Sequence, residues 1–355
     1  MIRSKKLISN ISRPDPESTS RIDIYRFEKN ERTTLFDKKT FNDIIKTLTP
    51  FDLVAYGEIE PFYDSACNFL MIERNQLLVT PGGDQGIKYI FETFLNVNDE
   101  VINFKPNYAM YSVYTEMFGG KEIVKYFQND LSINEDEIIK SINSKTKFII
   151  ISNPGHNGKL ISKNKLLKIL EIIKSSNTIL VIDEAYVDFS KFSMINYINK
   201  YKNLIIVRTL SKGFGLASIR VGFLISCKQI IREVYKVKPV HEISGVAAKI
   251  SKYLIENNHI MSSYVNAVEL GKSELIKNFQ SMGIEFLPTD SNFMYFKLNN
   301  KIDSKIVYNK LLENKIYIRS TSNIPPFNNY LRVTIGDQKQ MNFFCSSLKK
   351  IINKI

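Results

Sequence analysis

Cysteine is scarce in the 355-residue sequence, and long apolar runs are absent. The three cysteines are odd in number and far apart, at Cys67, Cys227 and Cys345. They predict neither a disulfide framework nor a zinc site, and they fit a reducing cytoplasm. No stretch approaches the roughly 18 consecutive apolar residues that a spanning helix needs, which excludes a multi-span membrane protein. The first 20 residues turn polar at once, so we expect no secretory segment.

The charge balance is strongly basic, with 49 Lys and Arg against 36 Asp and Glu, a net charge of +13. Phosphate, nucleic acid or lipid partners would explain this excess, and so would drift toward a composition rich in Lys, Ile and Asn. The lysines are spread along the chain and form no basic stripe, so we expect neither nucleic acid nor a membrane as partner. The hydrophobic share of 44% is typical of a soluble globular protein and excludes collagen or a wholly disordered chain.

Strand-like and helix-like segments alternate from about residue 41. The strand-like runs are 75–80, 100–104, 147–152, 178–186, 203–211 and 221–226. Apolar residues at helical spacing follow in 85–95 and 163–176. This order predicts an α/β fold, with a mostly parallel sheet covered on both faces. Ligands of such sheets lie beyond the carboxyl ends of the strands, where the polar residues of this chain collect.

The length suggests roughly two domains, and the texture of the sequence changes near residue 245. Long helical stretches run to about residue 282, and shorter strand-like segments follow. We therefore predict a large domain over 31–245 and a small α+β domain over 246–355. Residues 1–30 are polar and contain proline, and we expect them to form an arm that packs with the small domain.

Lys212 follows a buried strand, where a lysine can form a Schiff base if its amine is partly neutral. Alone, it would more simply be a surface lysine of a lysine-rich chain. Its neighbours Ser211 and Arg220, with two nearby glycines, suit a phosphate monoester. Gly83 and Asp84 open a second helix, whose N-terminal N–H groups could cap the same phosphate.

Asp183 ends an apolar run, where a carboxylate is costly unless it is paired. It could face the pyridinium nitrogen of an electron-sink cofactor, or it could serve as a helix cap or ion-pair partner. Tyr186 could offer its hydroxyl to the phenolate of that cofactor, and Tyr108 could stack on a planar ring. Ordinary packing is the alternative for each tyrosine taken alone.

Joined in order, these motifs resemble the fold-type-I aminotransferases that depend on pyridoxal phosphate. The run Asp183-Glu-Ala-Tyr186 and the run Thr209-Leu-Ser-Lys212 with Arg220 are similar to the histidinol-phosphate aminotransferase branch. The resemblance extends from about Asn30 to Gly336. It implies a large domain with a seven-stranded-type, mostly parallel sheet between helices, a small α+β C-terminal domain, and pyridoxal 5'-phosphate as cofactor.

The resemblance assigns roles to single residues. Lys212 would form the Schiff base with the cofactor and then shuttle a proton, and Asp183 would keep the ring nitrogen protonated. Tyr186 would bond the ring oxygen, and Tyr108 would stack on the ring. The residues implied to hold the cofactor phosphate are Gly83, Asp84, Ser211 and Arg220. No metal is implied.

The resemblance also implies residues for the substrate and for a partner subunit. Arg332 matches an arginine that clamps an amino-acid carboxylate, and Arg319 matches a second arginine that binds a substrate phosphate. Tyr56 matches a tyrosine that reaches the phosphate site of the neighbouring subunit. A homodimer with shared active sites is therefore expected.

Three segments depart from the family pattern, all near the expected substrate end. The family loop Asn-Pro-Asn-Asn-Pro-Thr-Gly is here Asn-Pro-Gly-His-Asn-Gly-Lys over 153–159. Asn157 is the favoured partner of the cofactor ring oxygen, with Asn153 and His156 as alternatives. Segments 239–241 and 30–33 also differ. The cofactor machinery is thus expected to be intact and the substrate pocket to be changed.

We therefore predict a cytoplasmic aminotransferase of amino-acid biosynthesis. It would move an amino group between a small phosphorylated amine or amino acid, histidinol phosphate by default, and 2-oxoglutarate or glutamate. A phosphoserine- or phosphothreonine-type decarboxylase on the same scaffold is the alternative. A basic binding protein that reuses the scaffold without catalysis is a third reading, and the intact Lys212, Asp183 and Arg220 argue against it.

Overall fold

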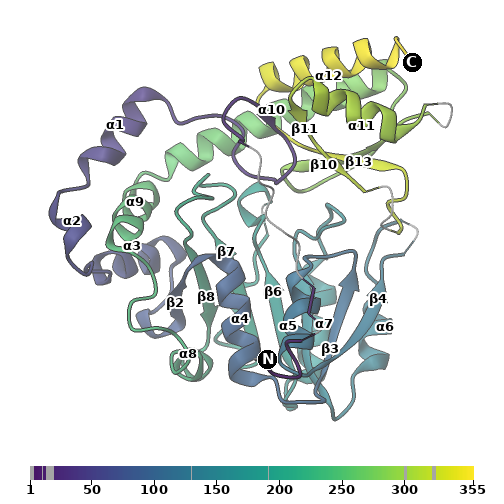
Figure 1. The fold of residues 1–355 in the computed structure, drawn as a ribbon. Coiled ribbons are helices and arrows are strands. Elements are labelled where there is room, and N and C mark those ends of the chain that lie inside the picture. The colour runs from purple at the N-terminus through teal and green to yellow at the C-terminus, as the bar shows by residue number, and fades with distance from the viewer. Residues whose placement is uncertain are drawn as a thin grey trace.

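A seven-stranded sheet forms the centre of the larger part of the molecule (Figure 1). The computed structural model describes residues 4–9, 11–12, 20–128, 130–190, 192–299, 302–321 and 325–355. The strand order is β2-β8-β7-β6-β5-β3-β4, and β8 alone runs antiparallel to its neighbours. The strands are β2 (Leu77–Thr80), β3 (Glu100–Lys105), β4 (Lys121–Tyr126), β5 (Thr146–Ser152), β6 (Ile179–Asp183), β7 (Leu204–Thr209) and β8 (Gly222–Ser226). The predicted mostly parallel α/β sheet is confirmed.

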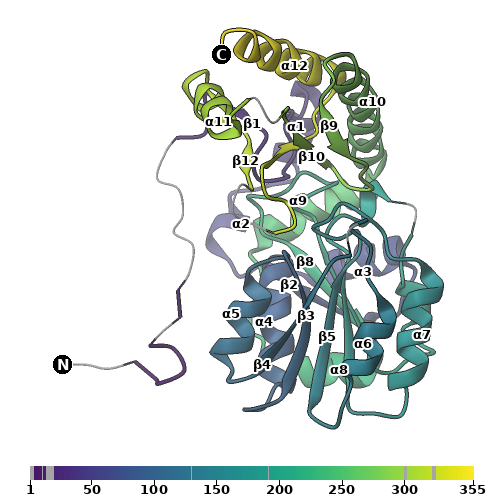
Figure 2. The ribbon, with the colours of Figure 1, turned by 90° about the vertical axis from the view of Figure 1, so that its right-hand side faces the viewer.

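Both faces of this sheet are buried, because alternate side chains of each central strand enter different cores. In β5, Phe148 and Ile150 face one core, whereas Ile149 and Ile151 face the other. One face is covered by α4 (Gly82–Phe94), α5 (Met110–Met117) and α8 (Lys228–Val234). The other face is covered by α3 (Glu60–Leu70), α6 (Glu135–Ser141), α7 (Lys163–Ile173) and α9 (Gly245–Glu256). Figure 2 shows α4 and α5 on one side of the sheet and α6 and α7 on the other.

Strand β4 is absent from the strands expected from the sequence. It lies at the edge of the sheet beside β3, and its residues are only half-buried or exposed. Its sequence KEIVKY therefore alternates with lysines, as suits an exposed edge, and lacks the continuous apolar run of the central strands. Strand β6 ends at Asp183, earlier than the expected run to residue 186, because the chain turns there into the short helix η2 (Val187–Phe189).

A four-stranded antiparallel sheet lies above the first in Figure 1, in the order β12-β13-β10-β9. Its strands are β9 (Glu285–Leu287), β10 (Phe293–Lys297), β12 (Arg319–Ser320) and β13 (Tyr330–Thr334). The helices around it are α10 (His259–Ser281), α11 (Ser304–Glu313) and α12 (Gln338–Ile352). These elements share a separate apolar core.

Residues near the N-terminus join this smaller core. Strand β1 (Tyr25–Arg26) pairs in parallel with β11 (Ile316–Tyr317), and Phe27 is fully buried in the core. The predicted arm, residues 1–30, lies partly outside the described residues. The chain then passes through α1 (Lys38–Lys46) and α2 (Phe51–Val54), and the remaining short helices are η1 (Arg74–Gln76) and η3 (Ile195–Tyr197).

The three cysteines are free thiols, each buried in a different apolar core. Within the described ranges, no helix combines the length and the apolar character needed to cross a membrane. The same residues contain no group of three or more His, Cys, Asp or Glu side chains placed to hold a metal ion.

Candidate active site

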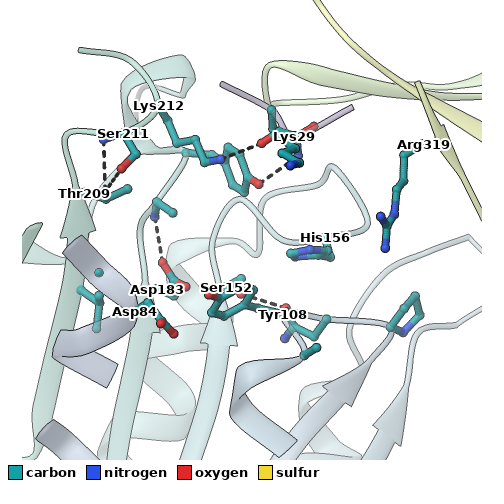
Figure 3. A pocket seen from close by; sticks show the side chains of 18 of the residues that line it. Lys29, Asp84, Tyr108, Ser152, His156, Asp183, Thr209, Ser211, Lys212 and Arg319 are labelled. Atoms are coloured by element: carbon teal, nitrogen blue, oxygen red, sulfur yellow. Dashed lines mark hydrogen bonds between the residues drawn. The ribbon is translucent and has the colours of Figure 1, made fainter. Parts of the chain in front are cut away.

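A cavity of about 510 Å³ lies between the carboxyl ends of the large-sheet strands and the smaller sheet. This volume is typical of small-molecule sites. Figure 3 shows Ser211, Lys212 and Asp183 on one side of it, with His156 and Arg319 across from them. Of the predicted site residues, those that line the cavity are Gly83, Asp84, Tyr108, Asp183, Tyr186, Ser211, Lys212, Arg220, Arg319 and Arg332. Tyr56 and Asn157 are absent from the lining.

One end of the cavity is built for an anion by the turn between β2 and α4. Gly82 has φ +81°, and a Cβ atom there would lie 2.5 Å from Nη2 of Arg220. The turn therefore needs glycine, both for its backbone conformation and for the close approach of the guanidinium. Gly83 and Asp84 lie in the first turn of α4, where backbone N–H groups have no partner within the helix.

Ser211 lies beside this arginine at the end of β7. Nη1 of Arg220 donates to Oγ of Ser211 at 3.3 Å. Oγ1 of Thr209 donates to the same Oγ at 2.9 Å and accepts the Ser211 N–H at 3.1 Å. These bonds hold the serine hydroxyl and the arginine together, which suits a phosphate monoester.

Lys212 reaches across the cavity, and its Nζ donates to the backbone oxygen of Lys29 at 3.0 Å (Figure 3). Burial, and then the positive charges of Arg332 and Arg220, lower the pKa of Lys212 to about 8. Glu31 and Asp183 act in the opposite direction. A sizeable fraction of the amine is therefore neutral near pH 8, as a nucleophilic lysine requires.

Asp183 is buried at the end of β6, and hydrogen-bond donors reach both of its carboxylate oxygens. Oδ1 accepts the backbone N–H of Ala185 at 2.9 Å, and Oδ2 accepts the hydroxyl of Tyr111 at 2.5 Å. Burial raises the pKa of Asp183, while the two donors oppose the rise. Sequence reasoning missed Tyr111. Its only signal was its place three residues after Tyr108, at the start of α5.

The two predicted tyrosines both border the cavity. The hydroxyl of Tyr186 accepts Nδ2 of Asn30 at 3.0 Å, a contact that spans 156 residues and could not be read from the sequence. The Nζ atom of Lys212 lies 5.6 Å from the ring centre of Tyr186. The Tyr108 ring stands nearly perpendicular to that of Tyr111, and burial together with Asp84 raises the pKa of Tyr108.

The loop 153–158 brings a histidine to the cavity. The buried Nδ2 of Asn157 donates to the backbone oxygen of Leu131 at 2.6 Å, so this side chain supports the loop from outside the cavity. Asn153 is likewise buried, and its Oδ1 accepts the Ile161 N–H at 2.8 Å. Of the three candidates, His156 alone is among the lining residues.

The imidazole of His156 has a buried Nδ1 atom without a hydrogen-bond partner. Burial, followed by the positive charges of Arg332, Lys212 and Arg319, lowers the pKa of His156 to about 3. The ring is therefore neutral at physiological pH, and one nitrogen remains available to a bound molecule.

Two arginines face each other on neighbouring strands of the small sheet. Arg319 of β12 and Arg332 of β13 are direct cross-strand partners, and both line the cavity. Like charges directly opposite each other destabilise a sheet unless an anion compensates them. Nη2 of Arg332 donates to the backbone oxygen of Glu28 at 2.8 Å, and its Nε atom is buried without a partner.

Tyr56 lies away from this cavity, on the surface. It is 82% exposed, and its ring stacks on His241 with 4.1 Å between ring centres. The structure of one chain therefore does not bring Tyr56 to the other predicted phosphate residues.

The family model and two similar relatives indicate the same family. The model of the family "Aminotransferase class I and II" matches residues 54–348. A histidinol-phosphate aminotransferase of Clostridium novyi is 30% identical over 320 residues, which cover 89% of this chain and 88% of the relative. The histidinol-phosphate aminotransferase of Buchnera aphidicola is 34% identical over 294 residues, which cover 80% and 82%.

Solved structures share the fold at low sequence identity. The histidinol-phosphate aminotransferase of Sinorhizobium meliloti, solved in complex with pyridoxal-5'-phosphate, has a TM-score of 0.87 at 17% identity, with 99% and 98% of the two chains covered. The L-threonine-O-3-phosphate decarboxylase of Porphyromonas gingivalis has a TM-score of 0.77 at 18% identity, with 92% and 99% covered.

Proposed function

Because the chain belongs to the class I and II aminotransferases, and is thus a pyridoxal-phosphate-dependent aminotransferase, we propose that it acts on a small phosphorylated amine. Histidinol phosphate is the first candidate, since the curated relatives described above carry that name. The amino group would pass to 2-oxoglutarate or come from glutamate. We place the enzyme in the cytoplasm, where three free buried thiols are stable.

The residues present fit pyridoxal phosphate. The cavity is large enough, its anion-binding end joins Arg220, Ser211 and the glycine turn, and Lys212 stands beside it with a lowered pKa of about 8. The partnerless Nδ1 of His156 offers one more polar contact. When bound, the cofactor supplies an electron sink for the substrate carbon.

Each of these side chains would have a separate task. Arg220, Ser211 and the N-terminus of α4 hold the phosphate group, and Asp183 holds a ring nitrogen. Lys212 can accept or return a proton at Nζ, because its pKa lies near working pH. Tyr108 and Tyr186 orient the ring.

The cross-strand pair Arg319 and Arg332 is the observation that carries the substrate assignment. It puts two guanidinium groups in the wall of one cavity, which suits an anion on the substrate. Tyr295 and Phe327 also line the cavity, and their rings stack at 4.2 Å. They offer a flat wall to a ring such as imidazole.

We also propose a homodimer in which Tyr56 completes the phosphate site of the partner subunit. Tyr56 lies in an exposed apolar segment, in which Phe51 is 69% exposed, Leu53 79% and Val54 84%. Such a patch favours a protein partner over solvent. A second copy of the chain accounts both for the patch and for the absence of Tyr56 from its own cavity.

A phosphoamino-acid decarboxylase is the second candidate. The two opposed arginines could hold the phosphate and the carboxylate of one substrate, and the fold is shared with a threonine-phosphate decarboxylase. The altered loop with His156 leaves room for a changed reaction. This candidate predicts CO2 release without any amino acceptor.

The test mixes purified enzyme and pyridoxal phosphate with histidinol phosphate, phosphoserine, phosphothreonine or serinol phosphate, with no acceptor present. Visible absorbance of the cofactor and release of CO2 are followed together. Conversion to pyridoxamine phosphate without CO2, strongest with histidinol phosphate, is the expected result. CO2 release with an unchanged final spectrum would establish the decarboxylase instead, and conversion with another compound would replace the substrate.

A further inference from the structure

The hydroxyl of Tyr111 joins Asp183 to a second buried hydroxyl in the wall of the cavity. It lies 2.5 Å from Oδ2 of Asp183 and 3.0 Å from Oγ of Ser152. Tyr111 is fully buried, on α5, while its two partners end the neighbouring strands β6 and β5. A helix on one face of the sheet therefore reaches the carboxylate that faces the cavity.

The chemistry of its two partners settles where the Tyr111 hydrogen points. Oγ of Ser152 donates to Oδ1 of Asn107 at 3.0 Å, so the serine hydrogen is engaged. The same Asn107 oxygen accepts the Tyr108 N–H at 2.9 Å, which fixes the orientation of the amide. An ionised Asp183 can only accept, and its Oδ2 lies nearer to the Tyr111 hydroxyl than Oγ of Ser152 does. The bond to Asp183 therefore has a phenol donor and a carboxylate acceptor.

We propose that Tyr111 is a positioning residue that keeps Asp183 ionised and directed at the ring nitrogen of the cofactor. This proposal rests on the assignment of Asp183 to that nitrogen. A donor to the charged form of a carboxylate favours that form, whereas burial favours the neutral acid. A neutral Asp183 would leave the ring nitrogen without its anionic partner, and the electron sink would weaken.

The other groups around Asp183 do not replace this donor. The Ala185 N–H and the charge of Lys212 also favour the carboxylate, and Glu184 opposes it. Among the groups that lower the pKa of Asp183, Tyr111 has the largest effect. Glu184 itself is paired with Arg208 at 2.9 Å, so its charge is partly compensated.

The experiment measures the protonation of the bound cofactor directly. Enzyme loaded with pyridoxal phosphate labelled with 15N in the ring is titrated by NMR, in wild type and in Tyr111→Phe. We expect the apparent pKa of the ring nitrogen to fall by about one unit in the variant, a tenfold change typical of a lost hydrogen bond to a charged group. The kcat should fall with it, while KM changes little.

Tyr201→Phe is the matched control. It removes a tyrosine–carboxylate bond of the same 2.5 Å length, to Glu171, on residues outside the cavity lining. It should leave the 15N titration unchanged. Replacement of Tyr111 by 3-fluorotyrosine strengthens the donor without removing the ring, and it should move the apparent pKa upward. This second variant decides the question if Tyr111→Phe does not fold.

The variant Asp183→Asn tests the role of Asp183 separately from the role of Tyr111. If Asp183→Asn changes the 15N titration and neither Tyr111 variant does, the role of Tyr111 is wrong and Asp183 stands. If Asp183→Asn leaves the titration unchanged, the placement of Asp183 at the ring nitrogen is wrong, and the proposal for Tyr111 falls with it.

Discussion

The two ends of the cavity are built differently. The end proposed to hold the cofactor phosphate, here called the phosphate end, consists of turns that directly follow strands β2 and β7. Its polar groups already bond one another, as Ser211 and Arg220 do. The opposite end joins loop 153–158, the segment 28–30 and two strands of the small sheet. It retains buried polar atoms without partners, on His156 and Arg332.

This difference separates a preformed site from an open one. Bonds among the phosphate-end residues fix their geometry before any ligand binds, which suits a cofactor that stays through every cycle. A bound molecule can satisfy the partnerless polar atoms at the other end, so the free energy of binding there depends strongly on the ligand chosen. We therefore propose that substrate identity is decided at the open end.

Loss of Lys212 would break the preformed end most severely. We expect Lys212→Ala to reduce turnover by about a thousandfold or more, because the amine that would form the Schiff base is lost. The cofactor should then be removable by dialysis, whereas the wild type retains it. End-point assays with the best of the four phosphorylated compounds measure the loss. Unchanged turnover would rule out Lys212 as the reacting amine.

Loss of Arg332 would test the open end. We expect Arg332→Gln to lower kcat/KM by about a hundredfold, because a buried charge-assisted contact to the substrate is lost. Initial rates against substrate concentration measure it. Arg232→Gln is the matched control, since Arg232 is 77% exposed on α8, and it should behave as wild type.

The same variant should shift a pH profile. The charge of Arg332 helps to hold the pKa of Lys212 at about 8, so its removal raises that pKa. Capture of pyridoxal phosphate by cofactor-free enzyme needs the neutral amine, and its rate should rise with pH through a midpoint near 8 in the wild type. In Arg332→Gln the midpoint should lie at higher pH. An unshifted midpoint would show that the charge of Arg332 does not affect the pKa of Lys212.

A shared phosphate site would extend the preformed end across two subunits. We expect Tyr56→Phe to weaken cofactor affinity by about tenfold, because one hydroxyl contact to a phosphate is lost. Equilibrium titration measures the change, with the exposed Tyr126→Phe as control. Mixing Tyr56→Ala with Lys212→Ala should restore activity in hybrid dimers. A monomer in sedimentation would contradict the shared site.

The loop 153–158 should show the smallest and most selective effects. Asn157→Ala removes the bond to Leu131 and should lower the free energy of unfolding by about 1–2 kcal/mol, with a normal cofactor spectrum. His156→Ala should leave stability nearly unchanged and alter the spectrum. Denaturant unfolding and absorbance titration distinguish the two, and the reverse pattern would return the cofactor contact to Asn157.

Sequence patterns predict the residues of the preformed end better than those of the open end. The apolar run before Asp183 and the motif ending in Lys212 were sufficient to place both beside a cavity, because strand ends of a parallel sheet meet at one edge. Edge strand β4 is not predicted, because its lysines interrupt the apolar run that marks the central strands. The bond of Tyr111 to Asp183 and that of Asn30 to Tyr186 join distant segments, and no local spacing reports them.

Asn30 has a consequence for how the enzyme is made. Its backbone N–H donates to Oγ1 of Thr334 at 3.0 Å, across 304 residues. Its backbone oxygen accepts a hydrogen bond from Nδ2 of Asn292, and its side-chain amide donates to the hydroxyl of Tyr186. During synthesis from the N-terminus, the large sheet can form while segment 25–30 still lacks its partners in the C-terminal part of the chain. In a nascent chain, Lys212 is therefore exposed before the small sheet covers it. The active site is complete only when β13 has emerged from the ribosome.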